Sequence, residues 1–119
     1  MIKYEIKTDD FEFRFGTSKD SIPEMSASEV IDFYMDGDCN DPHLEARFDT
    51  LEEAQADFSK HYANYGRTRA EKGYTFWLLR GEVAWIEENE YDEDGEFDQG
   101  GVTYGFSVEG YAPEGEENE

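Results

Sequence analysis

The chain has 119 residues, a formal charge of −21 and an aromatic content of 16%, which suits one domain with a substantial core. The aromatic content argues against a disordered acidic chain, because such chains are usually poor in large apolar residues. The charge argues against direct binding to DNA, RNA or anionic membranes, whose phosphates would repel it.

The first sixteen residues predict a β-hairpin. Apolar residues alternate with charged ones on both sides of Asp9-Asp10: Ile2, Tyr4 and Ile6 before it, and Phe11, Phe13 and Phe15 after it. A period of two is typical of strands with one buried face. We therefore expect two paired strands that meet at Asp9-Asp10, with Gly16 at the end of the second. No apolar leader follows Met1, and no stretch reaches the ~20 apolar residues of a membrane span.

Two helices are expected, and each begins with capping-box spacing. Ser26 lies three residues before Glu29, and apolar residues then follow at helical intervals over 27–35, although 30–35 also suits a strand. Thr50 and Glu53 have the same spacing before a longer apolar stripe of Leu51, Ala54, Phe58, Tyr62 and Tyr65, with Gly66 as a natural end. Between the two helices we expect a loop over 36–42 and a short strand over 44–48.

The remainder of the chain is predicted to be rich in strands. Arg67, Arg69 and Lys72 are expected in a loop, followed by strands over 74–79, 83–91 and 102–108. Arg80-Gly81 is either a tight turn or a bulge in one long strand, and 92–95 is a turn. Residues 112–119 are expected to form an acidic disordered tail. The predicted fold is a single α+β domain over 1–111, an antiparallel sheet with one or two helices packed on one face.

The charge is polarised along the chain. Residues 81–119 carry fourteen acids and no base, or −14, whereas residues 1–80 carry seventeen acids and ten bases, or −7. Repulsion at this density lowers the stability of the compact state, so a partner with a strongly positive site is the simplest reason for it. Many of these acids fall in one predicted hairpin: Glu87, Glu88, Glu90, Asp92, Glu93, Asp94, Glu96 and Asp98.

This acidic hairpin has two interpretations. Carboxylates two residues apart on a strand project from one face about 6.6 Å apart, of the same order as the step between phosphates on an extended nucleic-acid strand. Carboxylate also accepts bidentate hydrogen bonds from arginine, as phosphate does, so the hairpin could occupy a basic site built for DNA or RNA. Alternatively, the charges only protect an exposed edge strand from aggregation.

Metal binding and catalysis are not expected. Residues 92–98 resemble the start of a calcium loop, but the twelfth position is Thr103 rather than a bidentate Glu. A second group falls in one loop: Asp36, Asp38, Cys39, Asp41 and His43. One Cys and one His fall short of a structural zinc site, and the neighbouring acids disfavour the thiolate that a nucleophilic cysteine needs. We therefore expect no cofactor and no enzyme activity.

Aromatic residues complete the set of candidate interface residues. Trp77, Trp85 and Tyr104 are expected mostly in the sheet core, whereas Tyr91 and Tyr111 lie at strand ends among acids and suit an interface. The predicted partner-binding residues are Glu87, Glu88, Glu90, Tyr91, Asp92, Asp94, Glu96, Asp98 and Tyr111.

The small size, the charge, the strand-rich acidic hairpin and the lack of an enzyme motif together resemble the DNA-mimic inhibitors of phages and mobile elements, of the anti-CRISPR and anti-restriction types. Phe48–Ala54 also resembles a strand-to-helix junction common in small bacterial and phage proteins. The resemblance implies an inhibitor that occupies the nucleic-acid site of a Cas effector or restriction enzyme. Cys39 is the only cysteine, which fits a reducing cytoplasm.

Two other hypotheses stay open. One is a non-catalytic protein–protein interaction module whose acidity serves solubility. The other is salt adaptation, against which the polarised charge argues because solvation alone would not spare the first half of the chain.

Overall fold

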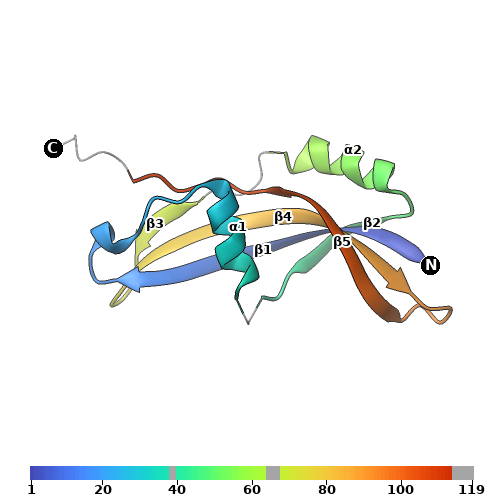
Figure 1. Ribbon diagram of the computed structural model, residues 1–119, viewed down its shortest axis with the longest axis horizontal. Helices are drawn as coiled ribbons and strands as arrows, with labels where there is room; N and C mark the ends of the chain where they lie inside the picture. Colours follow the sequence, from blue (N-terminus) through green and yellow to red (C-terminus); the bar gives the residue numbers. More distant parts are fainter. Residues whose placement is uncertain (38–39, 64–67, 114–119) are drawn as a thin grey trace.

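The computed structural model describes residues 1–37, 40–63 and 68–113. Within them, a five-stranded antiparallel sheet carries two helices (Figure 1), which confirms the predicted α+β class. The elements in chain order are β1 (Ile2–Gly16), a 3-10 turn (Lys19–Ser21), α1 (Ala27–Met35), β2 (His43–Phe48), α2 (Leu51–His61), β3 (Arg69–Lys72), β4 (Trp77–Tyr91) and β5 (Phe97–Ser107). The strand order is β2-β1-β4-β3, and β5 also pairs with β4.

β1 and β4 form a long central ribbon. Their register runs without interruption from Ile2 opposite Glu90 to Arg14 opposite Leu78. The ribbon extends along the length of an elongated molecule of 59 × 27 × 19 Å (Figure 1). The hairpin expected at Asp9-Asp10 is therefore wrong, because residues 2–16 are one strand. Of the two alternatives for Arg80-Gly81, the structure has one long strand rather than a turn, and the pairing with β1 shows no register shift there.

The apolar pattern of β1 changes phase because its buried side changes from one face of the sheet to the other. Alternate residues of a strand point to opposite faces. Ile6 packs with Ile86 and Ala54 on one face, whereas Phe11 packs with Leu79 on the other. The change falls at Asp9-Asp10, which contains no glycine or proline to turn the chain. A change of covered face thus produced the pattern that predicted a hairpin.

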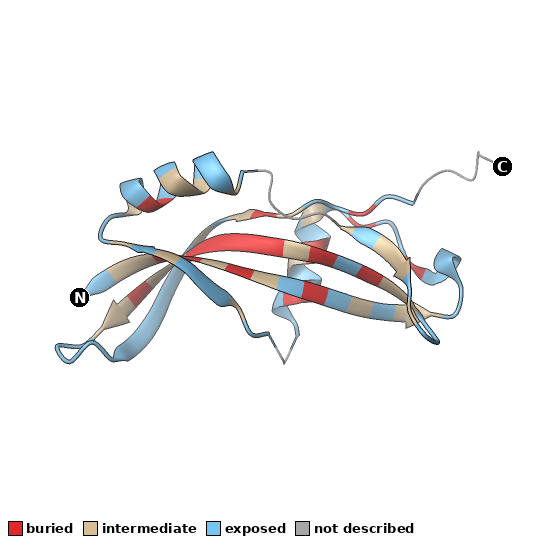
Figure 2. Cartoon of the chain, turned by 180° about the vertical axis from the view of Figure 1, so that it is seen from behind, coloured by how far each residue is buried: buried red, intermediate tan, exposed pale blue. Residues whose placement is uncertain are grey.

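Each helix covers a different face. Ser26 and Glu29 form the predicted capping box of α1, whose buried Val30 and Tyr34 belong to the cluster around Phe11. The side chain of Thr50 caps α2, whose buried Ala54 belongs to the cluster around Ile6. In Figure 1 α1 crosses in front of the sheet, and in Figure 2 it lies behind it. The helices thus lie on opposite faces, whereas the sequence pattern placed them together on one.

Other segments differ from the expectation in smaller ways. Arg69–Lys72 is a strand paired with the start of β4 rather than a loop, and β5 begins at Phe97 rather than at residue 102. The short strand before α2 is confirmed as β2. Several expectations fall outside the described residues: those for Asp38, Cys39, Tyr65, Gly66, Arg67 and 114–119. Among the helices of the described segments, none is long and apolar enough to cross a bilayer.

Candidate functional site

The tip of the β4–β5 hairpin is a tight acidic turn, as predicted for 92–95. The Gly95 N–H donates to the Asp92 carbonyl (3.0 Å), and the Asp92 N–H donates to the Glu96 carbonyl (2.9 Å). The Asp92 carboxylate accepts from the backbone N–H groups of Asp94 (3.0 Å) and Glu96 (2.8 Å). Gly95 has φ +83°, a conformation that favours glycine. Asp92 therefore organises the turn, and its neighbours carry the free charge.

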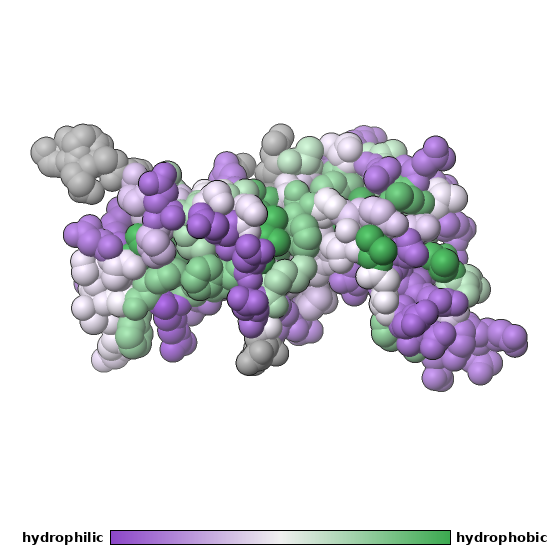
Figure 3. All heavy atoms as spheres, viewed as in Figure 1, coloured by the Kyte–Doolittle hydropathy of each residue, from purple (hydrophilic) through white to green (hydrophobic). Residues whose placement is uncertain are grey.

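Every residue from Asp92 to Gly100 is exposed. The tip is the hydrophilic projection at the lower right of Figure 3, and it stays pale blue in the burial view of Figure 2. Within the described parts of the chain, no ion pair involves an acid of this stretch: Asp92, Glu93, Asp94, Glu96 or Asp98. Five carboxylates thus gather on a projecting turn without an ion-pair partner among the described residues.

The three acids at the base of the hairpin are tied into the sheet. Glu87 accepts from Trp85 Nε1 (2.8 Å) and Asn89 Nδ2 (3.0 Å), and it pairs with Lys7 Nζ (3.3 Å). Glu88 accepts from the Tyr104 hydroxyl (2.9 Å). Glu90 accepts from Gln99 Nε2 (3.3 Å).

Strand alternation also places Glu87 on one face and the pair Glu88 and Glu90 on the other. The predicted ridge is therefore not one ladder. The acids near the sheet are hydrogen-bonded to it, whereas the acids of the tip form no ion pair within the described residues.

The two aromatic interface candidates are engaged inside the molecule. Tyr111 is 7% exposed and packs in the α1 cluster, where its backbone exchanges two 2.8 Å hydrogen bonds with Met25. Its burial contradicts the expectation of an exposed anchor. Tyr91 is half-buried: its hydroxyl donates to Glu5, and its ring lies 5.0 Å from the Arg47 guanidinium carbon. Neither ring offers the free surface that the sequence suggested.

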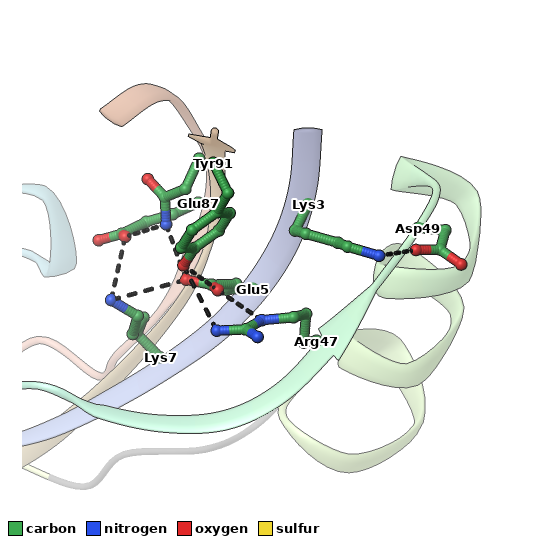
Figure 4. Close-up of polar contacts among 8 residues, drawn as sticks. Lys3, Glu5, Lys7, Arg47, Asp49, Glu87 and Tyr91 are labelled. Atoms are coloured by element: carbon green, nitrogen blue, oxygen red, sulfur yellow. Dashed lines mark hydrogen bonds and ion pairs between the residues drawn. The ribbon is translucent and has the colours of Figure 1, made fainter. Parts of the chain in front are cut away.

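A polar cluster on β1, β2 and β4 surrounds Glu5 and was not predicted (Figure 4). Glu5 is only 1% exposed, and its two oxygens are both engaged. Oε2 accepts from Arg47 Nε (2.8 Å) and from the Tyr91 hydroxyl, and Oε1 accepts from Asn89 Nδ2 (2.8 Å) and lies 4.0 Å from Lys7 Nζ. A single strand pattern carries no signal for this cluster, because only the pairing of three strands assembles it.

These contacts shift the pKa values of the cluster. Burial alone would raise the pKa of Glu5, but hydrogen bonds from Tyr91, Asn89 and Arg47 outweigh it and hold the pKa below its ordinary value. Burial also raises the pKa of Glu87. Hydrogen bonds from Asn89 and Trp85, together with the charge of Lys7, outweigh this effect, so the pKa of Glu87 is lowered as well. Burial and the hydrogen bond to Glu5 raise the pKa of Tyr91. The cluster suits a charged structural acceptor rather than a group that transfers protons.

The loop after α1 is organised around Asp9. Asp9 Oδ2 accepts from the Tyr34 hydroxyl (2.7 Å) and the Asp41 N–H (3.3 Å), and Asn40 Nδ2 donates to the Tyr34 carbonyl (2.8 Å). Burial and the hydrogen bond to Asp9 raise the pKa of Tyr34. Over residues 1–37, 40–63 and 68–113, no three His, Cys, Asp or Glu residues gather in a way that could hold a metal ion.

No family model, curated protein or solved structure matches this chain. Its function therefore has to be inferred from the residues themselves.

Proposed function

We propose that this protein binds and inhibits a nucleic-acid-processing enzyme by occupying its positively charged DNA or RNA site. The observation that carries the proposal is the hairpin tip, where five exposed carboxylates between Asp92 and Asp98 form no ion pair within the described residues. An arginine-rich or lysine-rich site supplies the missing counter-charges, because carboxylates accept the same bidentate hydrogen bonds as phosphates.

Six of the ten bases form ion pairs with acids elsewhere in the protein. Lys3 pairs with Asp49, Lys7 with Glu87, and Arg47 with Glu5. At the other end of the sheet, Arg14, Arg69 and Arg80 pair with Glu12 and Glu71. Since these cations are used within the body, the field at the tip is strongly negative and would steer association with a basic partner.

In the proposed role the protein acts by binding alone, without catalysis or a cofactor. A Cas effector or a restriction enzyme fits the partner chemistry, since both hold nucleic acid in basic channels. The proposal places this inhibition in the cytoplasm, where such enzymes meet invading DNA. The alternative is an ordinary interaction module whose acidity serves solubility, and it requires that the tip contribute nothing specific to binding.

Two variants of equal charge separate these possibilities. Asp94→Lys, Glu96→Lys and Asp98→Lys reverse the tip but leave Asp92 in place to hold the turn. Glu24→Lys, Asp32→Lys and Glu109→Lys reverse three exposed acids elsewhere. Each triple variant changes the charge from −21 to −15 (−21 + 6), so a difference between them reports position and not total charge.

The experiment captures bacterial proteins on the immobilised wild type at low salt and elutes them with duplex DNA. An eluted nucleic-acid enzyme is then purified, and its affinity for both variants and its inhibition are measured. We expect the tip variant to lose at least 100-fold in affinity and the matched variant less than about fivefold, consistent with loss of several charge-assisted contacts. Equal affinities, or a partner that duplex DNA cannot displace, would reject the proposal.

A further inference from the structure

Part of the outer edge of β1 has no partner strand. β4 pairs with one edge of β1 along its whole length, whereas β2 covers the other edge only from Tyr4 to Thr8. Beyond that point, from Asp9 to Gly16, no strand of the described segments pairs with the outer edge (Figure 1). An unpaired edge of this kind is a template for an added strand.

The register identifies which backbone groups face outward. Met1 and Tyr91 exchange two hydrogen bonds, of 2.8 and 2.7 Å, at the start of the ribbon. Because hydrogen-bonded pairs alternate along an antiparallel ladder, the odd-numbered residues of β1 bond to β4. The even-numbered residues Asp10, Glu12 and Arg14 therefore direct their N–H and C=O groups to the open edge. The Asp10 N–H already donates to its neighbour Asp9 (2.9 Å), which leaves Glu12 and Arg14 as the available pairing residues.

A groove of about 620 Å³ lies beside this edge, between β1 and the C-terminal end of α1. Phe11, Phe13 and Phe33 supply its apolar surface; the rings of Phe13 and Phe33 lie 5.2 Å apart, and Phe33 is 46% exposed. Apolar side chains are visible over this end of β1 in Figure 3, to the left of α1. The polar lining contains carboxylates and, among the described residues, no Lys or Arg: Asp9, Asp10, Glu12, Asp36 and Asp41.

This edge is also more regular than the outer edge of β5. The pairing of β1 with β4 shows no register shift between Ile2 and Arg14. The pairing of β5 shifts register three times, and β5 contains Gly100, Gly101 and Gly105. Bulges and glycines twist and weaken an edge, so the outer side of β5 is a poor template.

We propose that the open edge of β1 binds an extended, positively charged segment of another protein as an added strand. The backbone of Glu12 and Arg14 would supply the ladder, and a large apolar side chain of the segment would pack on Phe13 and Phe33. Glu12 is already paired with Arg14 and Arg80. Asp36 and Asp41, which form no ion pair within the described residues, would therefore select lysine or arginine. A second copy of the chain is a poor occupant, because it brings the same acids and a further charge of −21. This surface is separate from the hairpin tip, and the inference stands whether or not the tip binds an enzyme.

The test uses a defined probe, the capped and fluorescein-labelled peptide Lys-Lys-Val-Phe-Val-Lys-Lys, in which the phenylalanine and two of the lysines project from the same face of a strand. Two further peptides carry backbone N-methyl groups, one on the first, third, fifth and seventh residues and the other on the second, fourth and sixth. An added strand pairs through one of its edges only, and N–H groups alternate between edges. We therefore expect one methylated peptide to bind at least tenfold more weakly than the probe, and the other within about threefold. Equal affinities for the two methylated peptides would indicate binding through charge alone and would overturn the proposal.

Two further readouts locate the peptide. In the unmodified protein, the probe should slow hydrogen exchange at the amides of Glu12 and Arg14; protection along β5 instead would overturn the proposal. Asp36→Asn with Asp41→Asn should weaken the probe at least fivefold, whereas Asp94→Asn with Glu96→Gln, an equal change of charge at the tip, should change affinity less than twofold. The variant with Asp94→Asn and Glu96→Gln should in turn bind the enzyme captured in the first experiment more weakly than the wild type does. The proposals for the two surfaces can therefore be rejected independently. A protein that sediments alone as a dimer, and as a monomer when Phe33→Ala is introduced, would assign the edge to a second copy and reject the basic segment.

Discussion

Glu5 and Arg47 face each other across β1 and β2, with Arg47 Nε 2.8 Å from Glu5 Oε2. The carboxylate is 1% exposed, whereas the Arg47 side chain is 48% exposed. The loss of hydration therefore falls mainly on the acid, which depends on its protein partners to stay charged. Tyr91 and Asn89 complete that set from β4, so one buried carboxylate connects three strands.

Replacing Glu5 by alanine should lower the free energy of unfolding by about 2–4 kcal/mol, because Asn89 and Tyr91 lose their acceptor in a buried place. Arg47 can turn to solvent and limits the loss. Glu12→Ala is the matched control, since Glu12 pairs with Arg14 and Arg80 at the surface, where such pairs contribute at most about 1 kcal/mol. Urea denaturation measures both variants. Equal losses would contradict the structural role assigned to Glu5.

Stability should pass through a maximum as the pH falls. Glu5 and Glu87 have folded-state pKa values below the ordinary 4.5, so their contribution is complete above about pH 4.5 and is lost as the pH falls through the lowered values. Milder acidification removes repulsion among the many acids and acts in the opposite direction. The melting temperature should therefore rise from pH 7 to about 5 and then fall. Glu5→Gln should flatten the acidic limb, and an unchanged limb would argue against this assignment.

Added salt should raise the melting temperature at pH 7. Repulsion between exposed charges is screened over about 10 Å at 0.1 M salt and over shorter distances at higher salt, and this chain carries −21. The lysine triple variant at 94, 96 and 98 should show a smaller rise than the wild type. Differential scanning calorimetry between 0.02 and 0.5 M NaCl measures the slope. A wild type indifferent to salt would show that the charges are too far apart to repel.

Tyr111→Phe should leave the protein equally stable or stabilise it by up to about 1 kcal/mol. The Tyr111 hydroxyl is buried and has no hydrogen-bond partner among the described residues, so its removal ends a desolvation cost without breaking a bond. Tyr111→Ala should instead lower stability by about 3–5 kcal/mol, because the ring fills the α1 cluster. Thermal and urea unfolding of both variants provide the comparison. A Phe variant that loses more than about 1 kcal/mol would reveal a partner for the hydroxyl.

Gly95→Ala should cost about 1 kcal/mol through the backbone alone. Gly95 has φ +83°, and a Cβ built there would meet nothing within 4 Å, so the cost comes from conformation and not from a clash. Gly95→Asn should cost less, because asparagine tolerates this region better. If alanine and asparagine destabilise equally, contacts rather than backbone conformation decide the turn.

Local signals in the sequence predicted the helices and the acidic turn well. Capping by Ser26 and Thr50, and the glycine at the end of Asp92–Gly95, each act within four residues. The unbroken β1 strand was missed because its apolar residues change face where a second cluster begins. That change depends on α1 and α2, which lie far along the chain, so no window on residues 2–16 contains it.

The candidate sites divide in the same way. Composition alone located the acids of the tip, because they follow one another in the chain. The Glu5 cluster was out of reach, since Arg47 and Asn89 lie 42 and 84 residues from Glu5. The same limit applies to Tyr111, whose burial depends on its pairing with Met25. Sequence spacing reports neighbours along a strand or a helix and not which strands meet.

The pairing of β1 with β4 also sets the order in which the protein can fold on the ribosome. β1 is synthesised before β4, yet it is paired from Ile2 to Gly16 with residues 77–90 of that strand. Such distant pairing is slow because a long loop must close first. The phenylalanines of β1 therefore stay unpaired with β4 until residues 77–90 have been synthesised, and a chain that stops before residue 77 lacks the centre of the sheet.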